Sequence, residues 1–326
     1  MIKYFSTGVF SRYVGLLIFV VICWIPSFVN PVASTSPHIS LIPELASLSK
    51  TFPISGLITS FIAYIFSVLF LNLTAVKQHL TGLISLTPAF FYIVITATLS
   101  YYFSSNIYIL ISLLLMVVIY YSLTLHERDN SIKNAFNAGF FLGISSLIYP
   151  PLVYLFLVIW ISILLHRDNN WRAFVSSIMG LVAPFVFLLT WFFLNDQFHT
   201  DVEHLKSALI PDFSFPIWSL HETIVFVLIL ITGLAISLNV LYSLTEKSIN
   251  LRRNLLVLVF LFLFIVVITL MFDKSMSVFM LVAIPMAMMS SNLAPKLRKN
   301  KWINRGLVVI IVAAIVIHLI DFLNVT

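Results

Sequence analysis

The sequence predicts an all-α fold, a bundle of helices that crosses a membrane many times. Hydrophobic residues make up 61% of the chain and charged residues only 9%, and the mean hydropathy is +1.08. Apolar segments of about 20 residues, the length that spans a bilayer as a helix, recur along the chain with short polar connections. Soluble domains have a much smaller apolar share. We therefore expect residues 1–326 to form one integral membrane domain.

About eleven apolar segments are predicted. In the first segment Arg12 precedes an apolar run that is longer than the core of a secretory signal peptide, about 7–15 residues. We interpret it as an uncleaved span. Two longer connections, residues 30–53 and 195–220, are expected to form outer loops. The predicted segments are 11–29, 54–73, 82–103, 106–124, 134–149, 150–166, 173–194, 220–244, 254–271, 276–291 and 304–321.

The fifth and sixth segments, which together cover residues 134–166, are separated only by Pro150 and Pro151. A single helix of this length would measure about 50 Å, whereas the hydrocarbon core of a bilayer is about 30 Å thick. Two prolines also interrupt a helix, because proline lacks the N–H and clashes with the preceding turn. We therefore expect a short helical hairpin that turns at the prolines. It should pack inside the bundle, since broken backbone at membrane depth needs protein or water around it.

The distribution of basic residues predicts which side of the membrane each loop occupies. Lysine and arginine accumulate in cytoplasmic loops. If the hairpin counts as two crossings and the amino terminus is cytoplasmic, only Lys50, Lys206 and Lys274 of the 18 basic residues lie outside. We therefore predict a multi-pass protein of the bacterial inner membrane with a periplasmic carboxyl terminus. The net charge of +6 then reflects orientation in the lipid bilayer, and no nucleic-acid partner is expected.

A stripe of small residues marks one face of the hairpin's first arm. Ala135, Gly139 and Gly143 recur at a spacing of four, which lets another helix approach closely. This pattern favours a helix-packing seam beside the turn at Pro150 and Pro151. The alternative is a broken helix that lines a ligand pathway, as in transporters.

The two outer loops hold the candidate catalytic and metal-binding residues. Glu44 is the acid of the first loop; the second contains the acids Asp201 and Glu203 and the imidazoles His199 and His204. Such groups can act as general bases or bind a divalent cation. However, Asp201 and Glu203 point apart on a helix, and the step from His199 to His204 differs from the four-residue step of a helical metal pair. No cofactor is predicted; a divalent cation and a merely solvated acidic loop both stay open.

Three stretches resemble an uncharacterised family of inner-membrane proteins from Bacteroidota, a domain of unknown function. They are "LNLTAVKQHLTGLISLTPAFFYIVI", "NAFNAGFFLGISSLIYPPLVYLFLVIW" and "WRAFVSSIMGLVAPFVFLLTWFF". The similarity extends over nearly the whole chain. It implies the polytopic fold and supplies no activity.

A fainter resemblance is to the GT-C class of polytopic glycosyltransferases. It rests on "GFFLGISSLIYPPLVYLFLVIWISILLHRDNNWRAF", a helix with small residues, a proline break, an apolar helix and a basic turn. GT-C enzymes use polyprenyl-phosphate sugars at the outer face and place an essential acid in the first outer loop. The resemblance implies that role for Glu44, and it leaves open whether the chain is an enzyme.

Three functions follow as hypotheses. The first is GT-C-like handling of polyprenyl-linked sugars at the periplasmic face in cell-envelope biogenesis, with Glu44 as the general base. The second is a non-catalytic scaffold in envelope assembly that docks another membrane protein through the face of Ala135, Gly139 and Gly143. The third is a lipid or solute transporter, for which the spans offer few of the buried charges that mark ion pathways.

Overall fold

The computed structural model describes residues 10–29, 53–81, 85–97, 99, 107–126, 130–166, 171–194, 203, 207, 209–210, 220–272 and 276–299. Within these residues the fold is all-α, as the composition predicts, and there is no strand. The α-helices are α2 (Phe10–Val29), α4 (Pro53–Lys77), α5 (Thr87–Ala97), α6 (Ile107–Leu123), α7 (Ser131–Ile148), α8 (Phe156–Leu165), α9 (Trp171–Leu194), α11 (Leu220–Tyr242), α12 (Ile249–Phe272) and α13 (Ala283–Lys299). Four short 3-10 helices join them, namely η2 (Thr124–His126), η4 (Pro150–Leu155), η5 (Leu244–Glu246) and η6 (Met276–Leu281).

Four of the described helices are long and apolar enough to cross a membrane: α4, α9, α11 and α12. Most of the others are shorter apolar helices. The predicted last segment, residues 304–321, lies outside the described residues. The number of eleven segments therefore stays a prediction.

Several helices differ from their predicted segments at their ends, and α5 and α13 differ the most. Helix α5 is much shorter than the segment 82–103, since it starts only at Thr87, where Pro88 suits the first turn. Helix α13 continues through Lys299, beyond the predicted end at residue 291. Its last residues are lysine, leucine and arginine, which all favour helices. The positive charges of lysine and arginine also suit a helix carboxyl terminus.

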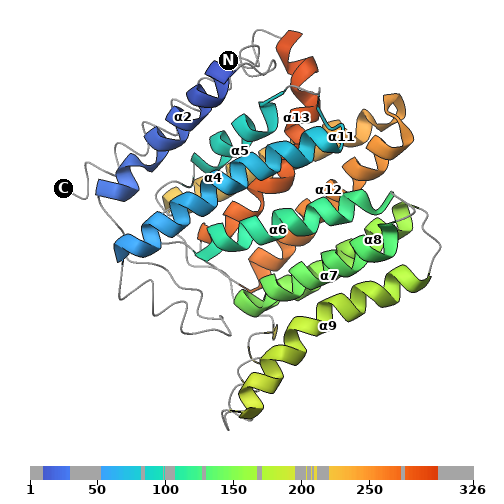
Figure 1. Ribbon diagram of the computed structural model, residues 1–326. Helices are drawn as coiled ribbons and strands as arrows, with labels where there is room; N and C mark the ends of the chain where they lie inside the picture. The colour runs from blue at the N-terminus through green and yellow to red at the C-terminus, as the bar shows by residue number, and fades with distance from the viewer. Residues whose placement is uncertain are drawn as a thin grey trace.

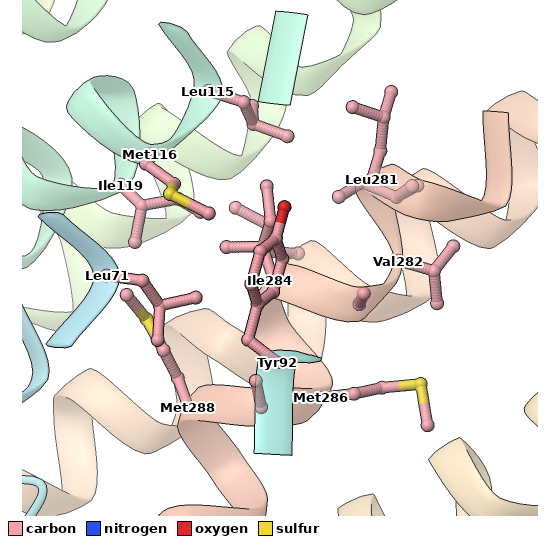
Figure 2. Close-up of a cluster of buried hydrophobic side chains, with 14 of the residues drawn as sticks. Leu71, Tyr92, Leu115, Met116, Ile119, Leu281, Val282, Ile284, Met286 and Met288 are labelled. Atoms are coloured by element: carbon pink, nitrogen blue, oxygen red, sulfur yellow. The ribbon is translucent and has the colours of Figure 1, made fainter. Parts of the chain in front are cut away.

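The helices lie roughly along one direction (Figure 1) and share a single apolar core. Helix α7 packs against α6 and α9, α5 packs against α4 and α13, and α12 packs against α8. Figure 2 shows the centre of the core, where Leu71, Tyr92, Met116 and Leu281 from four different elements meet with at most 2% of their surface exposed. The middle of the bundle is therefore filled by side chains.

The predicted hairpin region consists of α7, η4 and α8. Helix α7 ends where Tyr149 adopts an extended conformation (φ −134°, ψ 92°), and Pro150 and Pro151 then begin η4. Both prolines are buried, and α8 returns beside α7 (Figure 1). Protein thus surrounds the interrupted backbone.

The small-residue stripe of α7 lies against α9. A Cβ atom on Gly139 would stand 2.2 Å from the Ser177 carbonyl oxygen, and one on Gly180 would stand 2.2 Å from the Phe136 carbonyl oxygen. Gly143 faces Leu181 and the ring of Pro184, and Ala135 is fully buried. Backbones this close gain dispersion and weak Cα–H···O contacts. The stripe is therefore occupied within the chain, and the hypothesis that it docks a second protein needs correction: in this structure α9 already covers that face.

Helix α4 ends in a reversal that carries Gln78 into the bundle. The Leu80 N–H donates to the Ala75 carbonyl and the His79 N–H to the Val76 carbonyl, which together form a Schellman motif. His79 takes the left-handed conformation (φ 54°) that this motif requires. The reversal leaves His79 exposed and Gln78 buried.

We predict that Gly139→Ala and Gly180→Ala each lower the free energy of unfolding by about 1–3 kcal/mol, because the neighbouring atoms are backbone and cannot rotate away. Thermal unfolding in detergent, followed by circular dichroism, measures the change. Ile178→Ala, on the exposed face of α9, is the matched control and should shift stability by no more than about 0.5 kcal/mol. Stability unchanged by both glycine substitutions would contradict the close crossing.

Candidate functional site

The lysines and arginines of the described helices gather at one end of the bundle, which we call the basic end (Figure 1). There α4, α6, α8, α11 and α13 end and α2, α7, α9 and α12 begin. The described acids Glu203 and Glu222 lie toward the other end of the helices, whereas Glu246 lies in η5 at the basic end. The basic residues are Arg12, Lys77, Lys133, Arg172, Lys247, Arg252, Arg253, Lys296, Arg298 and Lys299.

Buried polar side chains connect four helices at the basic end. Asn254 of α12 lies between Gln78, which follows α4, and His166, which follows α8: its Nδ2 is 3.1 Å from Gln78 Oε1 and its Oδ1 is 3.0 Å from His166 Nε2. The other imidazole nitrogen, Nδ1, is 2.8 Å from the Ser162 carbonyl oxygen. We call these residues, with Ser162 and Ser122, the polar cluster.

The polar cluster also includes α6. The Ser162 hydroxyl donates to the Ser122 carbonyl oxygen at 2.6 Å. Exposed fractions are 7% or less for every member. Because an unpaired polar group costs stability when buried, these mutual hydrogen bonds explain how amide and imidazole groups are accommodated so far from solvent.

Positive charge borders the polar cluster. The Arg253 guanidinium donates a long hydrogen bond, 3.5 Å, to the His166 carbonyl oxygen. The Lys77 ammonium donates to the Tyr120 hydroxyl and lies 4.8 Å from the centre of the Tyr120 ring, a cation–π geometry. Both cations are thus held beside the cluster by contacts of their own.

Chemically, the polar cluster can bind protons and form directional hydrogen bonds. Histidine is the side chain suited to exchange a proton near neutral pH, and the two amides can each donate and accept. Among the described residues, no three histidine, cysteine or acidic side chains lie close enough together to hold a metal ion.

Most of the predicted catalytic and metal residues cannot be placed. Glu44, Asp201, His199 and His204 lie outside the described residues, and Glu203 is described and exposed. Their roles stay predictions, as does a divalent cation.

The two predicted outer loops start from one end of the bundle, opposite the basic end (Figure 1). The first connects the end of α2 to the start of α4, where Phe28 packs on Phe61 with ring centres 5.5 Å apart. The second connects α9 to α11, and its Leu209 carbonyl accepts a 3.0 Å hydrogen bond from the Tyr154 hydroxyl of η4. Leu209 of the second loop is therefore tied to the proline turn.

The sequence analysis missed the polar cluster because its members fall at or near segment ends. Gln78 lies beyond the predicted segment 54–73, whereas α4 continues to Lys77; Asn254 was the predicted first residue of its segment, whereas α12 begins at Ile249. The longer helices bring both amides inside the packed bundle. One signal was present in the sequence: Asn254 and His166 lie within one helical turn of continuous apolar sequence. A polar residue in that position can be buried when the helix extends past it.

We predict that Gln78 and Asn254 are energetically coupled. Asn254→Ala leaves the Gln78 amide and the His166 ring without their shared partner, and should lower the free energy of unfolding by about 1–3 kcal/mol. A double-mutant cycle with Gln78→Ala should give a coupling energy above about 0.5 kcal/mol. Asn239→Ala is the control, since this amide is exposed and its 3.4 Å hydrogen bond to the Ala235 carbonyl lies within its own helix. Additive effects of the two cluster substitutions would contradict the network.

Comparison with known proteins identifies the family and no activity. No curated protein and no solved structure matches the chain. One family model does match, over residues 45–324, and its description is a family of unknown function (DUF6427). Because the match covers most of the chain, the protein belongs to the DUF6427 family.

Proposed function

We propose that this chain is a multi-pass inner-membrane protein that handles polyprenyl-linked sugars at the end opposite the basic end. The amino terminus and the basic end are cytoplasmic, and the two outer loops are periplasmic. The segregation of lysine and arginine to one end supports this orientation.

The observation that carries the proposal is that both outer loops start at the same end of the bundle. Helix α2, which precedes the loop with Glu44, and α9, which precedes the acid-rich loop, both end there, and Leu209 is hydrogen-bonded to Tyr154 of η4. An acid and a cation-binding loop at one membrane surface are what transfer from a lipid phosphate requires: a general base for the acceptor hydroxyl and positive charge for the leaving phosphate. In this proposal Glu44 is the base, and the loop with Asp201 and Glu203 supplies the cation or acceptor site.

A second candidate is a non-catalytic scaffold in cell-envelope assembly, and the packed interior favours it. The side chains that Figure 2 labels are apolar and buried, so transport of a polar solute through this region would require the elements to separate. Since α9 covers the stripe of α7, a partner protein would contact another surface. The outward face of α9 offers large apolar side chains, among them Phe187, Trp191 and Phe193, each more than 60% exposed.

Mass spectrometry of the full chain, purified in mild detergent from its native membrane, separates the two candidates. Sugar handling predicts enrichment of a polyprenyl-phosphate glycan over the bulk lipids. It also predicts that Glu44→Gln is made at normal levels, still binds this lipid and fails to complement a deletion strain.

Two results would contradict the sugar-handling proposal. One is full complementation by Glu44→Gln, which removes the catalytic role of Glu44. The other is a stoichiometric protein partner without any enriched lipid, which supports the scaffold. Ser207→Gln, an exposed polar position in the second loop, serves as the control for substitution near that surface.

A further inference from the structure

The surroundings of His166 fix which of its nitrogens carries a proton. Nδ1 is 2.8 Å from the Ser162 carbonyl oxygen, and a carbonyl only accepts. The Ser162 hydroxyl, 3.4 Å from Nδ1, already gives its proton to the Ser122 carbonyl. Nδ1 must therefore carry a hydrogen whether the ring is neutral or charged.

The other nitrogen, Nε2, faces the Asn254 amide, which can present either its oxygen or its NH2 group. With the ring charged, Nε2–H donates to Asn254 Oδ1 at 3.0 Å, and Asn254 Nδ2 donates to Gln78 Oε1 at 3.1 Å. With the ring neutral, Nε2 becomes an acceptor. Both hydrogen bonds can then form only if both amides turn over, so that Gln78 donates to Asn254 and Asn254 donates to His166.

Partial change is unfavourable because it leaves like groups facing each other. A neutral ring with unturned amides would place Nε2 against Asn254 Oδ1, two acceptors in a buried site. Turning Asn254 alone would place its oxygen against Gln78 Oε1. Buried polar groups that lack a partner are costly, so loss of the proton and inversion of the two amides are coupled.

In the described part of the elements that pack against α8, the charged side chains are cationic. Helix α8 packs against α6, α7, α9, α12 and η4. In the described part of these elements the charged side chains are Lys133, Arg172, Arg252 and Arg253, and the remaining titratable ones are Tyr108, Tyr120, Tyr121 and Tyr154. Arg253 contacts His166 through the backbone carbonyl, and Lys77 of α4 directly precedes Gln78. In the charged state the ring donates to two acceptors, the Ser162 carbonyl oxygen and Asn254 Oδ1.

We propose that His166 is a proton-binding site whose charge sets the direction of the hydrogen-bond chain from His166 through Asn254 to Gln78. These hydrogen bonds join α8, α12 and α4 in both charge states. Gln78 accepts from Asn254 when the ring is charged and donates to Asn254 when the ring is neutral. Gln78 lies at the carboxyl-terminal end of α4, so the charge of His166 sets which group of the Gln78 amide faces Asn254. This inference is independent of sugar handling at the opposite end.

Nuclear magnetic resonance of the full chain in lipid nanodiscs tests the proposal, with ¹⁵N-labelled histidine, asparagine and glutamine and with His166→Gln, Asn254→Gln and Gln78→Asn variants for assignment. As the pH rises, Nδ1 of His166 should keep the shift of a protonated nitrogen while Nε2 moves to that of an unprotonated one. The side-chain NH2 signals of Asn254 and Gln78 should move with the same midpoint. Three results would overturn the proposal. The neutral ring could carry its proton on Nε2, the ring could keep one charge state at every pH, or the amide signals of Asn254 and Gln78 could stay constant while the ring titrates.

Two substitutions test the coupling from the amide side. Gln78→Glu places a group that only accepts when ionised, so Asn254 must donate to it and present Oδ1 to a charged ring. Asn254→Asp accepts directly from the charged ring, and Gln78 then turns its NH2 group toward the carboxylate. The midpoint of the His166 titration should rise by about one pH unit or more in each variant that folds. Asn239→Asp, on the exposed side of α11, should leave it unchanged. Equal midpoints in the wild type and in both cluster variants would contradict the relay.

Discussion

The cost of placing charge in an apolar environment is the constraint on which the rest of this structure depends. Charged side chains are expensive at the centre of a bilayer, and in the described helices lysine and arginine lie at one end. This segregation requires each apolar stretch to run from one end to the other, or to turn and come back. The reversal at Pro150 and Pro151 is therefore part of the same arrangement, because it returns the chain to the basic end at His166 and Trp171.

Between the two ends, close packing takes the place of polar contacts. Gly139 and Gly180 let the backbones of α7 and α9 approach each other closely. The core in Figure 2 consists of aliphatic and methionine side chains together with Tyr92. Polar side chains that do lie inside bond to one another, as in the polar cluster, or to their own helix, as Ser145 does to the Phe141 carbonyl. The bundle thus separates a packed middle from two chemically different ends. Proton binding belongs to the basic end and sugar handling, as proposed, to the other.

The architecture was largely predictable, and the candidate site was not. Hydropathy predicted helices in nearly the right places, and Pro150 with Pro151 predicted the break, because both signals depend on local sequence. The spacing of Ala135, Gly139 and Gly143 predicted a packing face but could not name α9 as its partner. The polar cluster escaped prediction because Gln78, His166 and Asn254 are far apart in sequence and lie at or near segment ends, where polar residues are usual. Only the longer α4 and α12 bring them together.

The most direct test of this account is the accessibility of single cysteines in intact cells to a thiol reagent that does not cross membranes. The natural Cys23 is buried and would be replaced by alanine, and cysteine would be placed singly at the exposed positions Lys133, Arg172 and Ser207. The account predicts labelling at 207 from outside, and labelling at 133 and 172 only after the membrane is opened. Labelling of 133 and 172 from opposite sides would show that the hairpin crosses once, and would contradict the charge segregation on which the orientation rests.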